Sequence, residues 1–240
     1  MGTYVLVHGA WQSASTWDLV VPRLRAAGHE VYTPLLTGLG AHGHRLTKEV
    51  TLSWHVADVL ALMNYEKLQD VILVGHSYAG MIITGVAEQA SAQIAHLVYV
   101  DAFIPNDGQS AMDLFPAAIQ DRFQEQAQTQ GNGWRLPGGE AQLDLWGLHE
   151  GAARDFVRSK LCDFSLNCFK EALPLPTDAA QDLPHTYIAC VAEAYPARLI
   201  FTQFAERAQR EGWHYHELPT GHDCHVEMPN EFSQLLLDLG

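Results

Sequence analysis

The sequence predicts an α/β protein with a parallel, doubly wound sheet, and two observations carry this prediction. First, short apolar runs with many β-branched residues, typical of buried strands, alternate along the chain with segments of helical periodicity. Second, one such run, residues 71–74, leads through small residues to a serine and at once into a helical pattern. Alternating strands and helices form a parallel sheet with helices on both faces. The 240 residues are enough for one large domain of this kind.

The first hundred residues supply most of the expected sheet. Residues 3–7 form a strand, and Ser15 or Thr16 can cap a helix that reaches residue 27 and ends at Gly28. Residues 30–32 form a second strand, before a loop rich in glycine and histidine at 33–47. Residues 52–65 carry apolar side chains at helical spacing. Strand 71–74, helix 81–89 and strand 94–100 then follow in order.

Residues 104–184 break this alternation. They contain six prolines, a glycine-rich stretch at 131–139 and only short helical patterns, such as 121–128 and 152–161. Because an insertion at the carboxyl ends of sheet strands lies over the ligand crevice, we expect a cap here. Its aromatic residues should partly line a pocket and partly pack on one another: Phe115, Phe123, Trp134, Trp146, Phe164 and Phe169.

The last part of the chain returns to the alternating pattern. It supplies strand 186–191, helix 197–211, strand 213–217 and helix 231–239. We therefore expect a core of residues 1–103 and 185–240 and a cap of residues 104–184.

Composition and charge narrow the function classes. The net charge is −14 with histidine neutral and no basic face is evident, which argues against nucleic acid and anionic membranes as partners. No apolar run approaches the ~20 residues of a membrane span. The start of the chain lacks a signal-peptide pattern and the four cysteines lack C-x-x-C spacing, so we expect reduced thiols and a cytoplasmic protein. The oligomeric state is not predicted, and a homodimer is left open.

Ser77 is the candidate nucleophile. It stands between a predicted strand and a predicted helix, with Gly75 two residues before it and Ala79 two residues after it. This is the G-x-S-x-G pattern of a nucleophile elbow, with alanine in its last position. Small residues are needed there because bulk would collide with the neighbouring strand or helix. The alternative is a glycine-rich turn with a bystander serine.

A serine hydroxyl needs a base, and His222 is the candidate. It directly follows the last strand, at the sheet end where Ser77 lies, so the chain order is serine, acid, histidine. His225 is the rival, and the two could be taken for an HxxH metal pair. We find no HExxH motif and no further ligand cluster, so we predict no metal.

Two carboxylates at strand ends are candidates for the acid that orients His222. Asp101 closes the strand at 94–100, and Glu193 follows the strand at 186–191. We favour Asp101, because its strand is buried and its neighbours are apolar. Asp223 is adjacent to the base and cannot easily turn back onto its ring. The other carboxylates set aside as solvated cap or loop residues are Asp113, Asp163 and Asp178.

Backbone N–H groups should bind the developing oxyanion. One donor should be the N–H of Tyr78, at the start of the elbow helix. The second should be the N–H of Ala10, with Trp11 as the alternative. Gly9 allows close approach of that loop. His8 either contacts substrate or is structural. The remaining histidines that we place on loops or the helix surface are His42, His44 and His55.

Four segments together resemble the α/β-hydrolase superfamily. They are VLVHGAW at residues 5–11, PLLTGLG at 34–40, GHSYAGM at 75–81 and GHD at 221–223. Within this superfamily the chain is similar to the small esterases that include plant methyl-salicylate esterases and hydroxynitrile lyases. Bacterial members of this branch include carbendazim-hydrolysing carbamate esterases. The resemblance covers nearly the whole chain and is weakest between residues 105 and 184.

The resemblance implies a six-stranded parallel sheet with a cap, an intracellular enzyme and no cofactor. It implies Ser77 as nucleophile and His222 as base. The plant esterases place their acid where this chain has Glu193, whereas haloalkane dehalogenases can place it where Asp101 stands. The lyases of this branch carry a lysine after the catalytic histidine and a threonine in the first loop. This chain has Asp223 and Gly9 there, which argues against lyase activity.

We therefore expect a serine hydrolase that cleaves a small carboxylic ester, or a carbamate, through an acyl-enzyme intermediate. Two alternatives remain on the same scaffold. One is a hydroxynitrile-lyase-like enzyme, and the other is a non-catalytic receptor for a small ligand.

Overall fold

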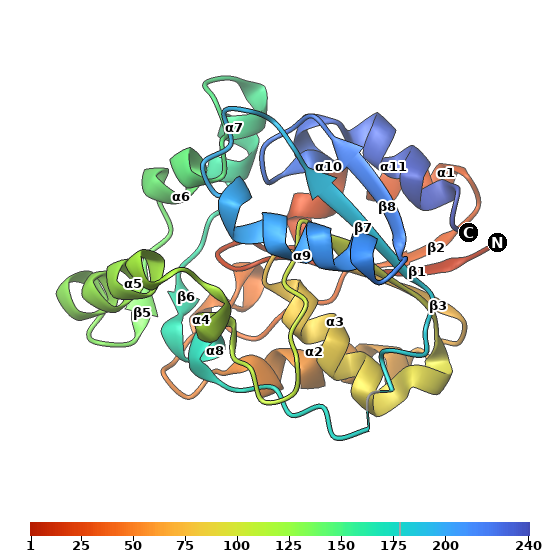
Figure 1. Cartoon of the computed structure of the whole chain (residues 1–240), viewed down its shortest axis with the longest axis horizontal. Coiled ribbons are helices and arrows are strands. Elements are labelled where there is room, and N and C mark those ends of the chain that lie inside the picture. Colours follow the sequence, from red (N-terminus) through yellow and green to blue (C-terminus); the bar gives the residue numbers. More distant parts are fainter. Residues whose placement is uncertain (178) are drawn as a thin grey trace.

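A six-stranded sheet, with every strand parallel to its neighbours, forms the centre of the molecule (Figure 1). The structure, a computed structural model, describes residues 1–177 and 179–240. The strand order is β2-β1-β3-β4-β7-β8. The predicted fold class is confirmed, and the predicted strands are found with ends that differ by at most two residues. Their bounds are β1 Thr3–Val7, β2 Glu30–Tyr32, β3 Val71–His76, β4 Ile94–Val100, β7 His185–Cys190 and β8 His214–Leu218.

The central strands are apolar because helices cover both faces of the sheet. All six residues of β3 are buried, and so are all six of β7. A parallel sheet with both faces covered favours continuous apolar strands over alternating ones. This is why the runs were visible in the sequence.

Two helices cover one face of the sheet and three cover the other. α1 (Val21–Ala26) and α11 (Pro229–Leu237) pack together, and the Tyr4 hydroxyl of β1 donates to the Leu236 carbonyl at 2.7 Å. The opposite face carries α2 (Leu52–Tyr65), α3 (Ala79–Ala90) and α9 (Arg198–Arg210). The two chain ends lie close together at one side of the sheet (Figure 1). Within residues 1–177 and 179–240, no helix is both long and apolar enough to cross a membrane.

The single helix predicted over residues 15–27 is wrong. The structure has a 3₁₀ helix at Ala14–Leu19 and then the separate α1. Pro22 lies in the first turn of α1. Proline has no N–H to donate to the preceding turn and its ring crowds that turn, so it starts a helix but does not continue one.

The helices and short strands between β4 and β7 gather at one end of the molecule, beyond the carboxyl ends of the sheet strands (Figure 1). Its two short strands pair antiparallel. Its elements are α4 Ala111–Leu114, α5 Ala117–Gln130, β5 Arg135–Leu136, α6 Glu140–Leu145, α7 Ala152–Arg158, β6 Phe164–Ser165 and α8 Leu166–Lys170. The division of the chain into core and cap stays a prediction. Asp178 lies outside the described residues.

The strand order fixes where a ligand can bind. β1 has β2 on one side and β3 on the other, so the chain leaves the ends of β1 and β3 in opposite directions. Such a switch point opens a crevice at the carboxyl ends of the strands. The loop after β1 and the turn after β3 meet there.

Candidate active site

Ser77 sits at the apex of a tight turn between β3 and α3. Its φ is 59°, in the left-handed region that a residue with a side chain rarely adopts. Its N–H donates to the Val100 carbonyl at 3.0 Å, and its own carbonyl accepts from the N–H groups of Gly80 and Phe103. These bonds hold the strained backbone in place, as a nucleophile elbow requires.

Glycine is needed on both sides of this turn. A Cβ on Gly75 would lie 2.8 Å from the Ala79 carbonyl oxygen, and a Cβ on Gly80 would lie 2.1 Å from the Phe103 carbonyl oxygen. Both distances are too short for any side chain. Ala79 itself is buried without such a conflict. The close approach to Phe103 is therefore made at residue 80, one position after the motif, and alanine is tolerated at 79.

His222 lies in the same cavity as Ser77 and is paired with Asp101. Its Nδ1–H donates to Asp101 Oδ2 at 2.6 Å, and both side chains are almost fully buried. The ring stacks on Phe201, with centroids 4.8 Å apart. Because Nδ1 carries the proton toward the carboxylate, Nε2 is the nitrogen with the free lone pair.

The backbone of His222 is fixed from two directions. Its N–H donates to the Trp146 carbonyl at 2.9 Å, and its carbonyl accepts from His76 Nε2 at 2.9 Å. The histidine loop is thus tied both to the segment between β4 and β7 and to the elbow strand.

The structure brings Asp101, and not Glu193, to the histidine. Asp101 follows β4 with a φ of 41°, and its N–H donates to the Ile188 carbonyl at 2.8 Å. Glu193 is exposed and makes no hydrogen bond or ion pair to any described residue. The Asp223 carboxylate accepts from Gln12.

Asp113 and Asp163 have structural partners. Asp113 forms a capping box with Ser110, and Asp163 pairs with Arg135 at 3.0 Å. Neither reaches the cavity that holds Ser77.

Tyr195 makes polar contacts to Asp101 and His222 that the sequence did not reveal. Its hydroxyl donates to Asp101 Oδ2 at 2.6 Å and lies 2.9 Å from His222 Nδ1. Burial raises the pKa of Tyr195 well above its ordinary value, and the charge of Asp101 adds to this. The phenol therefore stays protonated. The only available signal was its place in the loop after β7, which identifies no partner.

The loop after β1 approaches the elbow closely. A Cβ on Gly9 would lie 3.0 Å from Ser77 Cβ, so the predicted need for glycine is confirmed. Ala10, Trp11 and Tyr78 line the cavity beside Ser77. Within the described residues, the N–H groups of Ala10 and Tyr78 have no hydrogen-bond acceptor. They can bind an anionic oxygen, and their role as the oxyanion hole stays a prediction.

The cavity itself is apolar and largely aromatic. Besides Ser77 and His222, its lining is Ala10, Trp11, Tyr78, Phe103, Phe115, Phe123, Leu145, Trp146, Phe169, Ala197, Ile200 and Phe201. Four of the six aromatic residues predicted from the cap segment are among them. Phe164 is instead buried against Trp11 and Tyr78, and Trp134 lies outside this cavity.

The placement of His55 on the helix surface is wrong. The side chain is fully buried, with Nε2–H donating to the Thr37 carbonyl at 2.9 Å and Nδ1 lying 3.2 Å from the Tyr78 hydroxyl. Leu52, Val56 and Val59 already marked this face of α2 as buried. A histidine at residue 55 falls on the same stripe, which was the missed signal. His55 thus holds the Tyr78 ring beside the cavity.

Of the two roles considered for His8, substrate contact and structural support, the structure favours structural support. It is buried, its Nδ1 lies 3.0 Å from the Gly9 carbonyl, and it is not part of the cavity lining. Burial lowers the pKa of His8 to about 4. It stays neutral at ordinary pH.

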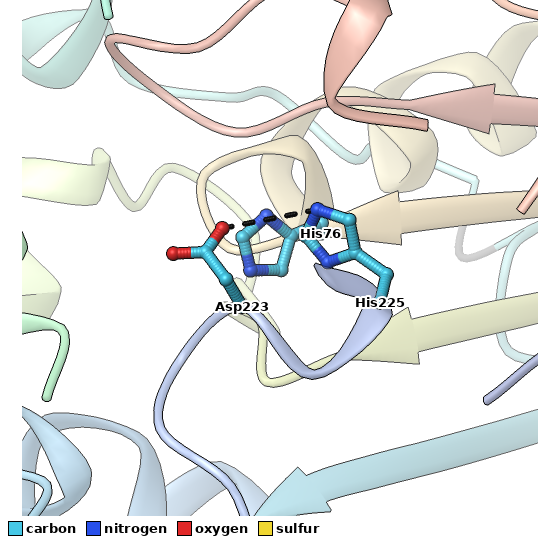
Figure 2. Close-up of side chains that lie close together, drawn as sticks. All are labelled: His76, Asp223 and His225. Atoms are coloured by element: carbon cyan, nitrogen blue, oxygen red, sulfur yellow. Dashed lines mark ion pairs between the residues drawn. The ribbon is translucent and has the colours of Figure 1, made fainter. Parts of the chain in front are cut away.

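A buried cluster of His76, Asp223 and His225 lies behind His222, and Figure 2 shows the three side chains converging. One possible ligand atom of each lies within 4.8 Å of the others. No spacing motif in the sequence joins His76 to Asp223 and His225, so this set was not among the predicted ligand clusters. Burial raises the pKa of Asp223 to about 6 and lowers that of His225 to about 3.

Two of these residues already have protein partners. Gln12 donates to Asp223 Oδ1, and Thr16 Oγ1 lies 2.9 Å from His225 Nε2. Asp223 Oδ1 and His225 Nε2 are themselves 3.8 Å apart (Figure 2). His225 does not line the cavity with Ser77, so the geometry favours His222 over its rival as base.

Comparison with known proteins agrees with this fold. Residues 4–235 match the alpha/beta hydrolase family. A carbendazim-hydrolyzing esterase from Nocardioides sp. is 36% identical over 249 residues, which span all of both chains. Methylesterase 2 of Arabidopsis thaliana is 29% identical over 68% of this chain and 60% of its own length. This chain belongs to the alpha/beta hydrolase family. It is an ester-cleaving hydrolase.

Solved structures support the same assignment of fold. An extracellular alpha/beta-hydrolase from a Paenibacillus species, described as homologous in structure and function to tobacco salicylic acid binding protein 2, superposes with a TM-score of 0.88. It is 26% identical and covers 100% of this chain and 99% of its own. A pyrethroid hydrolase from Sphingobium faniae has a TM-score of 0.76 at 22% identity, over 99% of this chain and 96% of its own.

Proposed function

We propose that this chain is a serine esterase that cleaves a small carboxylic ester, or a carbamate ester, through an acyl-enzyme intermediate. The observation that carries the proposal is one cavity that contains Ser77 on a strained turn and His222 held by Asp101. Nucleophile, base and acid come from the ends of three different strands. An arrangement of this kind is the requirement for activating a serine hydroxyl.

The proposed reaction has two halves. In the first, Ser77 Oγ attacks the carbonyl carbon while His222 Nε2 takes its proton, and the N–H groups of Ala10 and Tyr78 bind the oxyanion. His222 then gives the proton to the leaving alcohol as the acyl-enzyme forms. In the second half, His222 takes a proton from water as the water attacks the acyl group, and returns the proton to Ser77 Oγ as the acid product leaves. Asp101 keeps Nδ1 protonated and stabilises the imidazolium in both halves.

The lining of the cavity supports a neutral substrate with an aromatic or aliphatic body. No charged side chain of residues 1–177 or 179–240 lines it, apart from His222 when protonated. Burying an unpaired charge in such surroundings is costly. We propose that residues 104–184 act as the cap, because Phe115, Phe123 and Trp146 contribute to the lining. The carbendazim-hydrolyzing relative supports a carbamate as one candidate substrate.

The lyase alternative is disfavoured by the same lining. Within the described part of the chain, no lysine or arginine reaches the cavity, and Asp223 points instead to Gln12 and His225. The receptor alternative predicts no turnover. Measurable hydrolysis of p-nitrophenyl acetate therefore separates an esterase from a receptor.

Replacing Ser77 by alanine tests the proposal. We expect ester turnover to fall by about 10⁴- to 10⁶-fold with the fold unchanged, as when members of a triad are removed. Circular dichroism provides the folding control. A phosphonate inhibitor should add its mass to the wild-type peptide that contains Ser77 and not to the variant. A variant that keeps a tenth of wild-type activity would remove Ser77 from the mechanism.

We also propose a cytoplasmic location. The four cysteines, all unpaired, support it. The Paenibacillus relative is described as extracellular, so cell fractionation of the source organism is the discriminating measurement. Recovery of the protein from the culture medium would contradict this location. A homodimer stays open, and light scattering would test it.

A further inference from the structure

The Asp101 carboxylate is buried, and three donors of the protein satisfy it. The backbone N–H of Cys190 donates to Oδ1 at 3.3 Å. His222 Nδ1–H and the Tyr195 hydroxyl both donate to Oδ2, each at 2.6 Å. The two contacts to Oδ2 are the short ones, so the position of this oxygen depends on His222 and Tyr195 together.

The Tyr195 hydroxyl also limits what His222 can do. With its single proton directed at Asp101, the phenol oxygen presents only lone pairs to Nδ1, at 2.9 Å. A protonated Nδ1 is compatible with both acceptors, whereas an unprotonated Nδ1 would face two electron-rich oxygens. The contact therefore favours the tautomer in which Nε2 is free to accept a proton.

Tyr195 is itself rigidly held. Its side chain is buried, and its ring stacks on His222 with an interplanar angle of 25°. Its carbonyl accepts from the N–H of Arg198 at 3.2 Å, where α9 begins. Gly147, with a φ of 74°, approaches its backbone so closely that a Cβ there would lie 3.0 Å from Tyr195 Cα. The hydroxyl is thus placed by packing from two sides.

We propose that Tyr195 is a positioning residue of the proposed hydrolysis. Its hydroxyl fixes the position of Asp101 Oδ2 and favours the Nδ1-protonated form of His222. It does not contact the reacting atoms and acts only through the pair. The inference rests on the proposed function, because it assigns Asp101 and His222 their catalytic roles. It predicts an effect on turnover rather than on substrate binding.

The test is Tyr195→Phe, which keeps the ring and removes only the hydroxyl. Losing a hydrogen bond to a charged group should lower kcat about tenfold to a hundredfold, with KM within about twofold of wild type. The downfield proton resonance of the His222–Asp101 hydrogen bond, read by NMR in the resting enzyme, should move or broaden. Because this signal requires folded protein, reduced stability alone cannot imitate the expected result.

Tyr187→Phe is the matched control. The Tyr187 hydroxyl is also fully buried, but it accepts from the backbone N–H and donates to the carbonyl of Ala102, the residue after Asp101, both at 3.1 Å. It makes no hydrogen bond to Asp101 or His222. We expect its removal to leave kcat and the downfield resonance as in wild type.

A double-mutant comparison completes the test. If Tyr195 acts through Asp101, then Tyr195→Phe should change kcat little in an Asp101→Asn background. A Tyr195→Phe enzyme with wild-type kcat and an unmoved resonance would overturn the inference, and so would an equal loss in both backgrounds. These outcomes leave the proposed function intact, whereas full activity of Ser77→Ala would defeat the function without changing the resonance in Tyr195→Phe.

Discussion

Converting Asp101 to asparagine changes one hydrogen-bonding group at a buried point of the site. Oδ2 accepts from His222 Nδ1–H and from Tyr195 at 2.6 Å each. An amide has one oxygen and one NH₂ group. If the amide NH₂ faces His222 and Tyr195, it can accept a hydrogen bond from neither of them. If the amide oxygen faces them, the NH₂ points at the Cys190 N–H, which donates to Oδ1 at 3.3 Å in the wild type. Either orientation leaves a buried donor unpaired and removes the charge that stabilises the imidazolium.

We expect Asp101→Asn to lower kcat by about 10⁴-fold, the loss seen when the acid of a well-studied serine protease triad becomes an amide. At 25 °C this corresponds to about 5.5 kcal/mol of transition-state stabilisation. Glu193→Gln is the matched control, because Glu193 is an exposed candidate in the other strand-end loop. Its kcat should stay within about tenfold of wild type.

The assay is kcat for both variants on p-nitrophenyl acetate, with circular dichroism to verify folding. Our reasoning would be refuted by a dead Glu193→Gln enzyme beside an active Asp101→Asn enzyme. If both stay active, the reaction depends on Ser77 and His222 without either acid.

Three further predictions concern metals and pH. EDTA should leave activity unchanged, since Gln12 and Thr16 already engage the buried cluster; loss with EDTA and recovery with zinc would instead mark that cluster as a metal site. On the acid side, kcat/KM should fall as the base is protonated, and a flat profile from pH 5 to 8 would exclude a histidine base. Stability should also fall in acid, because burial lowers the pKa of His8 to about 4 and that of His225 to about 3. Because both pKa values are lowered, the unfolded chain binds protons at a higher pH than the folded protein does. This contribution to stability is complete above about pH 6.5 and is lost toward pH 4, at about 1.4 kcal/mol per pH unit for each histidine. The raised pKa values of Asp223, about 6, and Glu227, about 7, have the opposite sign and offset part of the loss, whereas the lowered pKa values of His76 and His185 add to it. Urea unfolding at pH 7 and pH 5 checks the sum, and equal stability at the two values would contradict it.

The sheet and the elbow could be predicted because their signals are local. Burial on both faces makes the strands continuous apolar runs, and a turn with a φ of 59° at Ser77 needs small neighbours such as Gly75. Each of these causes acts within a few residues of its effect. Pro22 was an equally local signal, and it explains why the helix expected from residue 15 is interrupted.

The contacts around the histidine could not be predicted, because they join segments that are distant in sequence. Tyr195 meets Asp101 across 94 residues, and His222 meets Asp101 across 121. No periodicity marks a side chain that reaches sideways from the end of one strand to the end of the next. His55 differs, since its place on the apolar face of α2 was readable and only its partners Thr37 and Tyr78 were hidden.

The choice between two acids shows what the sequence lacked. Both candidates stand at strand ends, so position alone cannot separate them. What separates them is desolvation, because a carboxylate as buried as Asp101 is tolerated only if the fold supplies donors for it. β7 supplies one of the three, the Cys190 N–H at its end, and the loop after β7 supplies the Tyr195 hydroxyl and leaves Glu193 in solvent. The loop after β7 could have carried the acid. It instead supplies a hydrogen-bond donor to Asp101, the acid that follows the neighbouring strand β4. A tyrosine or other buried donor two residues after an exposed carboxylate in this loop is therefore the feature to seek where the acid follows β4.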